Sequence, residues 1–242
     1  MRLEPPVEVT RDKITFDVSE IEPILQGPAM DIPPFPPAMV TLKDGSTMVI
    51  RQAKLEEAPV MLEYVEKVMK IPHDFYDIVG ARVYAEILGW YRKRLKDPYT
   101  IIGLIDGEWV GFANGRLMNE KINISLHTMA LKRGLRIGAI MYYAKAAYAF
   151  EILGQEEWWA TYESYNGWKR WGVGMAQPSY PWPEYQHELG GARVYYITKE
   201  YWKTTVHDYI KQMTGVELVR PVPEELLEKN AEIKKVPKLE AI

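Results

Sequence analysis

The stretch from Asn123 to Leu153 constrains the fold of this chain more than any other. It begins with a strand-like alternation, passes through a basic, glycine-bearing turn at residues 133–139, and continues with apolar residues at helical spacing. A helix that starts directly after such a turn presents unpaired backbone N–H groups and the positive end of its dipole, and both favour a bound phosphate. The order strand, basic turn and helix therefore predicts a site for a phosphorylated ligand.

Composition excludes several other classes of protein. Thirty Lys and Arg against thirty-three Asp and Glu give a formal charge of -3, so no global positive field attracts nucleic acid or an anionic membrane. The absence of cysteine excludes disulfides, thiolate metal ligands and a cysteine nucleophile. No segment approaches the roughly 20 apolar residues of a membrane span, and the first ten residues are charged. We predict a soluble, cytoplasmic protein that binds neither membrane nor nucleic acid.

The chain divides into three parts by composition. Residues 1–44 form a proline-rich N-terminal arm, residues 45–215 a regular domain, and residues 216–242 a charged C-terminal extension. No helix persists in the arm, which is interpreted as a linker or a strap over the core, with a proline-motif docking site as the alternative. The crowded prolines of the arm are Pro23, Pro28, Pro33, Pro34, Pro36 and Pro37.

Alternating and helical patterns predict the elements of the central domain. The pair Asp106-Gly107 is typical of a two-residue hairpin turn, because a type I′ turn needs positive φ at both central residues. Strands are expected at residues 48–50, 99–105, 108–117, 123–131, 158–162 and 193–198. Helices are expected from Lys54 to Pro72, across residues 80–95, from Ile137 to near Gly154, up to Trp171, around residues 202–213, and in the tail after Pro221.

This order of elements resembles the GNAT superfamily of acetyl-CoA-dependent N-acetyltransferases over roughly residues 45–200. Residues 48–53 and 56–59 are similar to the family's first strand and helix, and residues 106–113 to its hairpin. The resemblance implies an α/β (α+β) fold with a mixed, mostly antiparallel central sheet flanked by helices.

The family's pyrophosphate-binding turn reads Arg/Gln-x-x-Gly-x-Gly/Ala, and Arg133, Arg136 and Gly138 occupy the matching positions. The outer two residues agree with the pattern, whereas Arg136 replaces the middle glycine. A side chain there reduces the room for the pyrophosphate, although its backbone N–H remains and its guanidinium could reach the 3′-phosphate of CoA.

The resemblance implies that acetyl-CoA is the co-substrate and that a primary amine attacks its thioester directly in a ternary complex, in a gap between two splayed strands. Asn166 follows the second of these two strands, where the family often has an asparagine that touches the cofactor. The residues expected to bind acetyl-CoA are Met129, Ala130, Leu131, Arg133, Gly134, Leu135, Arg136, Ile137, Gly138, Ala139 and Asn166. No metal is expected, because the four histidines show no ligand spacing.

His127 is the candidate general base, because it lies on the strand beside the expected thioester and the unperturbed pKa of histidine is near neutral. A histidine hydrogen-bonded within the sheet, with water relayed through Ser125 or Asn123 as the base, is the alternative. Tyr165 and Tyr180 are candidates to protonate the departing CoA thiolate.

Other readings stay open at this point. The aromatic loop at residues 168–185 either lines the acceptor pocket or forms the contact of a homodimer. The chain could be a catalytically inactive GNAT-fold module for binding or structure, a hypothesis that rests on Arg136 in place of glycine and on residues 171–174, which do not match the family's Tyr-x-x-x-Gly-Phe stretch. It could also use a longer acyl-CoA or an aminoacyl-tRNA as donor.

Overall fold

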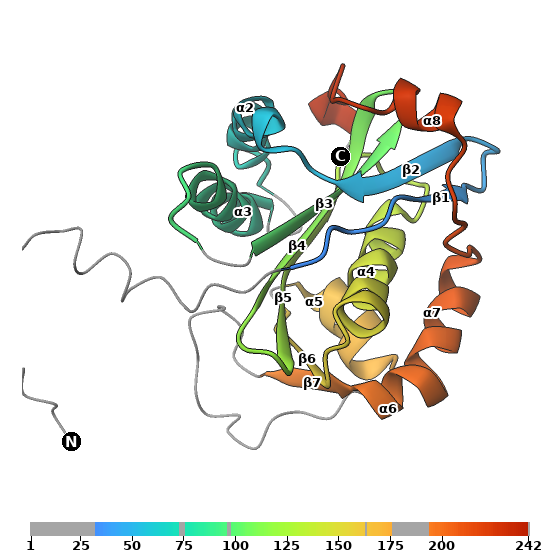
Figure 1. The fold of residues 1–242 in the computed structure, drawn as a ribbon. Helices are drawn as coiled ribbons and strands as arrows, with labels where there is room; N and C mark the ends of the chain where they lie inside the picture. Colours follow the sequence, from blue (N-terminus) through green and yellow to red (C-terminus); the bar gives the residue numbers. More distant parts are fainter. Residues whose placement is uncertain (1–31, 73–75, 96–97, 163, 176–193, 242) are drawn as a thin grey trace, which may run out of the picture.

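The computed structural model describes residues 32–72, 76–95, 98–162, 164–175 and 194–241. Within them, one sheet of seven strands follows the chain in the order β1-β2-β3-β4-β5-β6-β7 (Figure 1). Every neighbouring pair is antiparallel except β5 and β6, which are parallel. The strands are β1 (Ala38–Thr41), β2 (Thr47–Gln52), β3 (Pro98–Ile105), β4 (Glu108–Leu117), β5 (Ile122–Ala130), β6 (Glu157–Ala160) and β7 (Tyr195–Thr198).

Helices cover both faces of the sheet, so the core has a part on each side (Figure 1). On one face lie α2 (Ala58–Val68) and α3 (Tyr76–Tyr91). On the other lie α4 (Ile137–Ala147), which continues as a π-helical segment (Tyr148–Ile152), and α7 (His207–Thr214). The shorter helices are α5 (Tyr165–Gly167) with its π-helical continuation (Trp168–Val173), α6 (Lys199–Tyr201) with its own (Trp202–Val206), and α8 (Glu224–Lys229).

Most predicted elements are confirmed. The predicted bounds of β4 agree with the structure, and those of β3 and β5 differ by one residue at one or both ends. Asp106 and Gly107 both adopt positive φ, 52° and 75°, as the predicted hairpin turn requires.

The prediction for α3 was wrong in its bounds. The helix begins at Tyr76 instead of residue 80, and Leu95 lies beyond its end. Gly80 is an interior residue where α3 approaches α2, since a Cβ there would lie 2.9 Å from Met69 Cγ. The glycine thus marks close packing and not a helix start, and Leu88 is one of the more exposed apolar side chains.

The N-terminal arm contributes strand β1 to the sheet. The proline-rich sequence of the arm did not indicate a strand. Strand β1 follows the last proline of the run and pairs with β2. Before it, the Phe35 ring is buried edge-on against Tyr148, and the Phe35 N–H donates to Gln52 Oε1 at 2.9 Å. The described end of the arm is therefore part of the fold.

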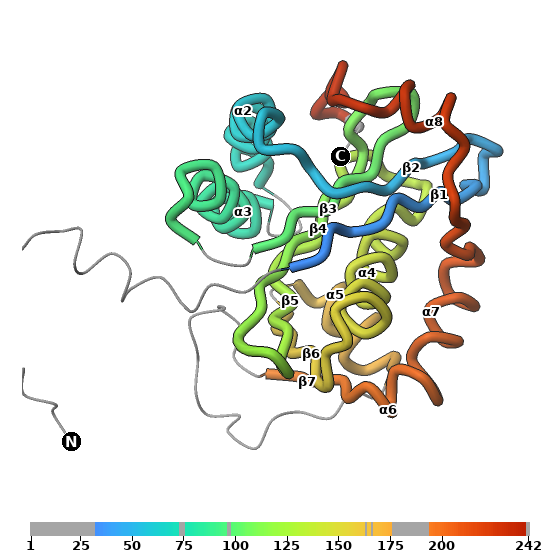
Figure 2. The backbone as a smooth tube through the Cα atoms, viewed as in Figure 1, coloured from blue at the N-terminus to red at the C-terminus, as the bar shows by residue number. Residues whose placement is uncertain are grey.

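The C-terminal extension also packs onto the domain, at both ends of its path (Figure 2). Val219 and Met39 of β1 exchange two backbone hydrogen bonds, of 2.9 and 3.0 Å. Farther on, the Trp109 N–H of β4 donates to the Lys235 carbonyl oxygen at 3.0 Å. The extension thus covers the edge of β1 and the tip of the β3–β4 hairpin.

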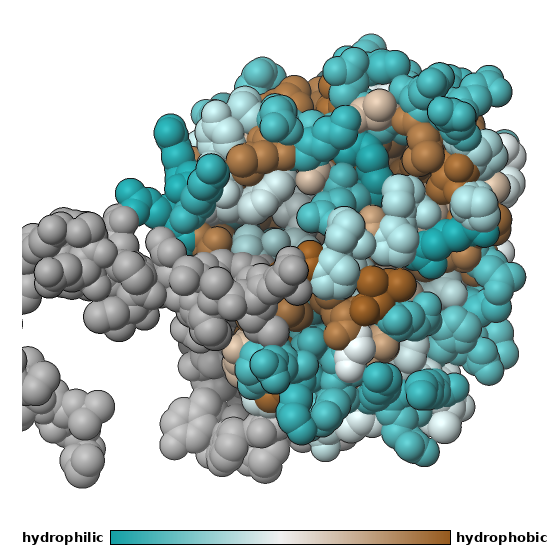
Figure 3. All heavy atoms as spheres, in the orientation of Figure 1, coloured by the Kyte–Doolittle hydropathy of each residue, from teal (hydrophilic) through white to brown (hydrophobic). Residues whose placement is uncertain are grey.

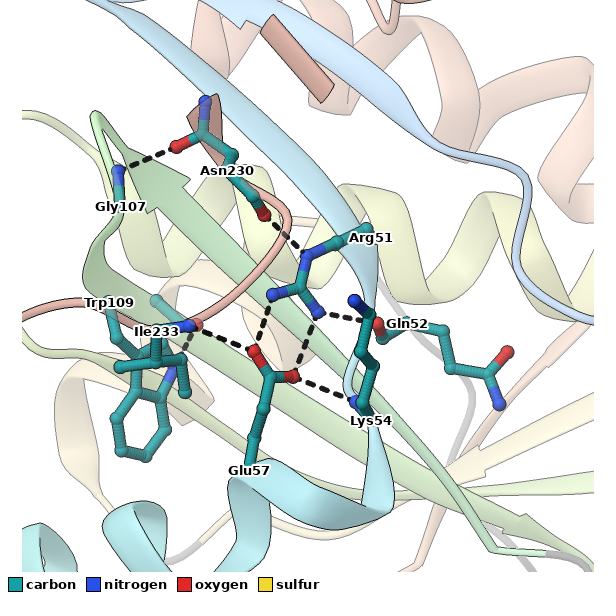
Figure 4. A network of polar contacts seen from close by, with 9 residues as sticks. Arg51, Gln52, Lys54, Glu57, Gly107, Trp109, Asn230 and Ile233 are labelled. Carbon is teal, nitrogen blue, oxygen red and sulfur yellow. Dashed lines mark hydrogen bonds and ion pairs between the residues drawn. The ribbon is translucent and has the colours of Figure 1, made fainter. Parts of the chain in front are cut away.

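A buried ion pair lies beneath this extension (Figure 4). The Arg51 guanidinium donates to both carboxylate oxygens of Glu57, at 2.5 and 2.9 Å, and to the Asn230 carbonyl oxygen at 2.8 Å. The N–H groups of Lys54 and Ile233 also donate to Glu57, at 2.8 and 3.0 Å. Burial opposes ionisation of Glu57, but these hydrogen bonds outweigh it and hold its pKa below 4.5.

On the face drawn in Figure 3, hydrophobic residues lie in small groups separated by hydrophilic ones. Within the described ranges, no helix is long and apolar enough to cross a bilayer.

Candidate active site

The basic turn between β5 and α4 has the backbone shape that a glycine would favour. Gly134 has φ 86°, and Arg136, directly before α4, has φ 60° and ψ 21°. The Ala139 and Ile140 N–H groups both donate to the Arg136 carbonyl oxygen, at 3.0 and 3.1 Å. The amides of Ile137 and Gly138 precede these bonds and sit at the positive end of the helix dipole.

Arg136 stands where the family pattern has glycine, and its conformation explains how. The left-handed backbone costs a residue with a side chain roughly 1–2 kcal/mol. Its guanidinium turns to the end of α7, where it donates to the carbonyl oxygens of Met213 at 2.8 Å and Thr214 at 3.4 Å. The guanidinium expected to reach the 3′-phosphate of CoA is thus engaged elsewhere.

The helix surface at Gly138 is open. A Cβ built there would meet Ala130 alone within 4 Å, its Cβ at 3.6 Å and its nitrogen at 3.9 Å. Packing within the described protein therefore does not require a glycine at this position. The space is suited to close approach by a ligand.

Tyr76, the first residue of α3, fixes the turn from the opposite face of the sheet. Its hydroxyl donates to the Ala130 carbonyl oxygen at 3.1 Å, and its ring lies 5.6 Å from the Arg133 guanidinium carbon. Arg133 is exposed to solvent. Through Tyr76, helix α3 therefore helps to position the Arg133 guanidinium at the turn.

The pairing of β5 with β6 ends just before the turn, because β6 ends at Ala160. Their parallel pairing runs from Ile122 and Glu157 to Ser125 and Ala160, whereas β5 continues to Ala130. A β-bulge between Ala113 and Gly115 shifts the register of the neighbouring β4–β5 pair at the same level. Because bulges bend a strand, β5 changes direction close to the point where its pairing with β6 ends.

His127 lies just past the last β5–β6 pair, but it is a weak base there. The imidazole of His127 is buried, and the backbone N–H of His127 donates to Asn114 Oδ1 at 2.9 Å. Burial and the positive charges of Lys145, Arg82 and Arg116 lower its pKa to about 3. The pKa of His127 in the fold is therefore far below the unperturbed value for which this residue was chosen as the candidate base.

Most of the other residues expected to bind the cofactor have buried or partly buried side chains. Side chains of Met129, Leu131, Ile137 and Ala139 are buried in the core, and Leu135 packs partly against it. Because these side chains are buried, a ligand would contact mainly the backbone groups of these residues. The Leu131 N–H is already bonded to the Val110 carbonyl oxygen at 2.9 Å.

Of the residues predicted after β6, the structure describes the side chain of Tyr165. Tyr165 opens α5 and is 64% exposed, with its ring centroid 5.9 Å from that of Trp168. Asn166 follows it in α5, but its side chain is not among those described. Tyr180 lies outside the described residues altogether. The structure thus unites His127 and the turn along β5 and α4, and places Tyr165 at the surface.

Lys145 was missed by the sequence analysis. It is 1% exposed, and its Nζ donates to the His127 carbonyl oxygen at 3.0 Å. A signal was present in the sequence, because residues 137–150 contain this one charge among apolar and aromatic residues. A single cation in an otherwise apolar helix is either paired or functional.

No group of three or more potential metal ligands occurs among the residues that the structure describes.

Comparison with known proteins gives a fold and no close relative. No protein-family model matches the sequence, and neither does any curated protein. RimJ from Mycobacterium smegmatis, solved in complex with CoA-disulfide, is similar in structure at a TM-score of 0.50 and 10% identity, over 76% of this chain and 98% of that one. An uncharacterized protein from Bacillus halodurans is similar at a TM-score of 0.52 and 10% identity, over 74% and 99%.

These likenesses agree with a mostly antiparallel sheet of seven strands that has helices on both faces. The chain has the GNAT fold.

Proposed function

We propose that this protein is an acyl-CoA-dependent N-acyltransferase that transfers an acetyl group from acetyl-CoA to a primary amine. One observation carries the proposal: the pairing of two sheet strands ends directly beside a basic turn, and the helix after the turn begins with the amides of Ile137 and Gly138, which have no acceptor within the helix. A gap between strands offers backbone groups to an extended chain such as pantetheine, and the turn offers amides to a diphosphate. The likeness to RimJ, which was solved with CoA-disulfide, supports this ligand class.

In the proposed reaction the amine nitrogen attacks the thioester carbonyl carbon. The C–N bond forms, the C–S bond breaks, and CoA leaves as a thiolate that takes a proton. Residues 133–139 bind the pyrophosphate, and the backbone of residues 126–130 orients the pantetheine and the thioester. Asn166, and a proton from Tyr165 or Tyr180, remain parts of the proposal.

His127 has a reduced role in this scheme. With a pKa of about 3 its imidazole is neutral at physiological pH and binds a proton poorly. The amine nitrogen is therefore expected to lose its proton to solvent, or through water at Ser125.

Isothermal titration with acetyl-CoA tests the binding step. Arg133→Ala removes one cation from the turn and should weaken affinity about tenfold, the scale of one charge-assisted contact. Arg92→Ala is a matched control, because Arg92 also lies over a tyrosine ring, at 5.5 Å, but follows α3. No heat at millimolar acetyl-CoA, or equal loss in both variants, would overturn the proposal.

A non-catalytic CoA-binding module is the second candidate, and the low pKa of His127 favours it. Release of CoA thiol in the presence of a panel of primary amines separates the two. Binding without thiol release for any amine would support the module.

Cytoplasmic location and a homodimer stay predictions. Mass measurement in solution tests the second.

A further inference from the structure

Lys145 contacts both β5 and β6 close to the end of their paired segment. It extends from the last turn of α4, and its Nζ donates a hydrogen bond to the carbonyl oxygen of His127, two residues past the last β5 residue paired with β6. The same Nζ lies 5.9 Å from the ring centroid of Trp158, a β6 residue that pairs with Asn123. One side chain thus contacts β5 through a hydrogen bond and β6 through an aromatic face.

The surroundings of the ammonium are unusually apolar for a charge. Lys145 is 1% exposed, and the Tyr142 ring also lies 5.9 Å from Nζ. Tyr142 in turn stacks on Trp171, with centroids 4.0 Å apart. Burying an ammonium is unfavourable unless hydrogen bonds and aromatic faces replace water. A methionine would fill the same space without this penalty, so packing alone does not explain a lysine here.

The bond to His127 gives an explanation. Where a ladder ends and one strand continues, the backbone groups of that strand need other partners. A lysine donor supplies one for the His127 carbonyl from the helix side. Strand β5 can then stay apart from β6 without an unpaired carbonyl, and no water or strand residue is needed in its place.

We propose that Lys145 is a positioning residue that holds β5 away from β6 and keeps the gap between them open for the pantetheine arm of an acyl-CoA. The assignment of the ligand rests on the proposed function. The opening of the strands is a property of the chain that can be measured without any ligand.

Because the chain has no cysteine, the amine at position 145 can be removed and restored chemically. Lys145→Cys is alkylated in urea and refolded. Treatment with 2-bromoethylamine returns an amine at nearly the length of lysine, whereas 1-bromopropane gives a neutral side chain of the same length. Lys145→Met provides a neutral variant that needs no refolding.

We expect the aminoethylated protein to bind acetyl-CoA within about threefold of the original, and the propylated protein and Lys145→Met at least tenfold more weakly. Residues 127–130 should exchange their amide hydrogens more slowly in the neutral forms, because the strands close. Tyr99→Phe is the control, since it removes the 2.8 Å bond from the Tyr99 hydroxyl to Asn123 Oδ1 on the paired part of β5. It should lower stability without changing affinity or exchange at residues 127–130.

Equal affinity and equal exchange in the aminoethylated and propylated proteins would overturn the role of Lys145. So would the same loss of affinity in Tyr99→Phe. If the unmodified protein does not bind acetyl-CoA, the proposed function fails alone, and the exchange measurement still decides whether Lys145 keeps the strands apart.

Discussion

The guanidinium of Arg136 donates a hydrogen bond to the carbonyl oxygen of Met213 at 2.8 Å. Met213 lies in the last turn of α7, where carbonyl groups lack intrahelical partners and positive charge is favourable. Arg136 also adopts the left-handed backbone conformation directly before α4. Arg136 therefore joins the start of one helix to the end of another.

We predict that Arg136→Ala lowers the free energy of unfolding by about 1 kcal/mol, because the bonds to α7 are lost and alanine keeps the strain. Arg136→Gly should lower it less, since glycine adopts this backbone without strain. Urea denaturation measures both. Equal losses would contradict the strain at this position.

The same variant tests what Arg136 does for the ligand. Because its guanidinium is committed to α7, Arg136→Gly should leave the affinity ratio of CoA to 3′-dephospho-CoA within about twofold of the original. A tenfold drop in that ratio, measured by titration calorimetry, would instead mean that the side chain swings to the 3′-phosphate.

Gly138→Ala should separate stability from binding. Alanine at an early position of α4 meets the Ala130 Cβ at an ordinary 3.6 Å, so stability should rise by roughly 0.5–1 kcal/mol. Acetyl-CoA affinity should fall at least fivefold, because the added methyl group occupies the space at the turn. Thermal unfolding and calorimetry give the two values. A variant that gains stability at unchanged affinity would place the diphosphate elsewhere.

The pKa of His127 makes stability depend on pH. Its folded value of about 3 lies below the ordinary 6.5, so the unfolded chain takes up the proton first. This stability is fully present above pH 6.5 and is lost as pH falls toward 3, by at most about 1.4 kcal/mol per pH unit. Between pH 6.5 and 4.5, above the range in which Glu57 titrates, His127→Gln should show a flatter profile of unfolding free energy. Parallel profiles would mean that the imidazole stays hydrated in the folded state.

Glu57→Gln should be among the most destabilising conservative changes in this chain. It leaves the buried Arg51 guanidinium without its counter-charge, and loss of one partner of a buried pair costs about 3–5 kcal/mol. Glu63→Gln is the control, because the Glu63–Lys67 pair has a comparable 2.7 Å separation but is exposed, and its denaturation midpoint should hardly move. Similar shifts of the denaturation midpoint in the two variants would mean that the Arg51–Glu57 pair does not stabilise the fold.

Local patterns predicted most of the fold because each part of the signal lay within a few residues. The hairpin at Asp106 needed two residues that tolerate positive φ, and the alternation of β5 was visible in nine consecutive positions. Strand β1 was missed because it is four residues long and follows a proline run. The strand receives its partners from β2 and Val219, which local sequence does not reveal.

The candidate site was predicted less well, for a related reason. The position of the turn came from its motif, but the direction of the Arg136 side chain depends on Met213, 77 residues away. The pKa of His127 depends on burial and on Lys145, Arg82 and Arg116, which come from three other elements. Such long-range electrostatics are properties of the packed structure, and one-dimensional patterns carry little of them.

The contact between Arg51 and Asn230 spans 179 residues. A chain emerging from the ribosome exposes Arg51 and Glu57 long before Asn230 and Ile233 have been synthesised. Until they arrive, Arg51 lacks the Asn230 oxygen and Glu57 the Ile233 amide. The hydrogen bonds around this buried ion pair are therefore complete only after residues 230–233 have been synthesised.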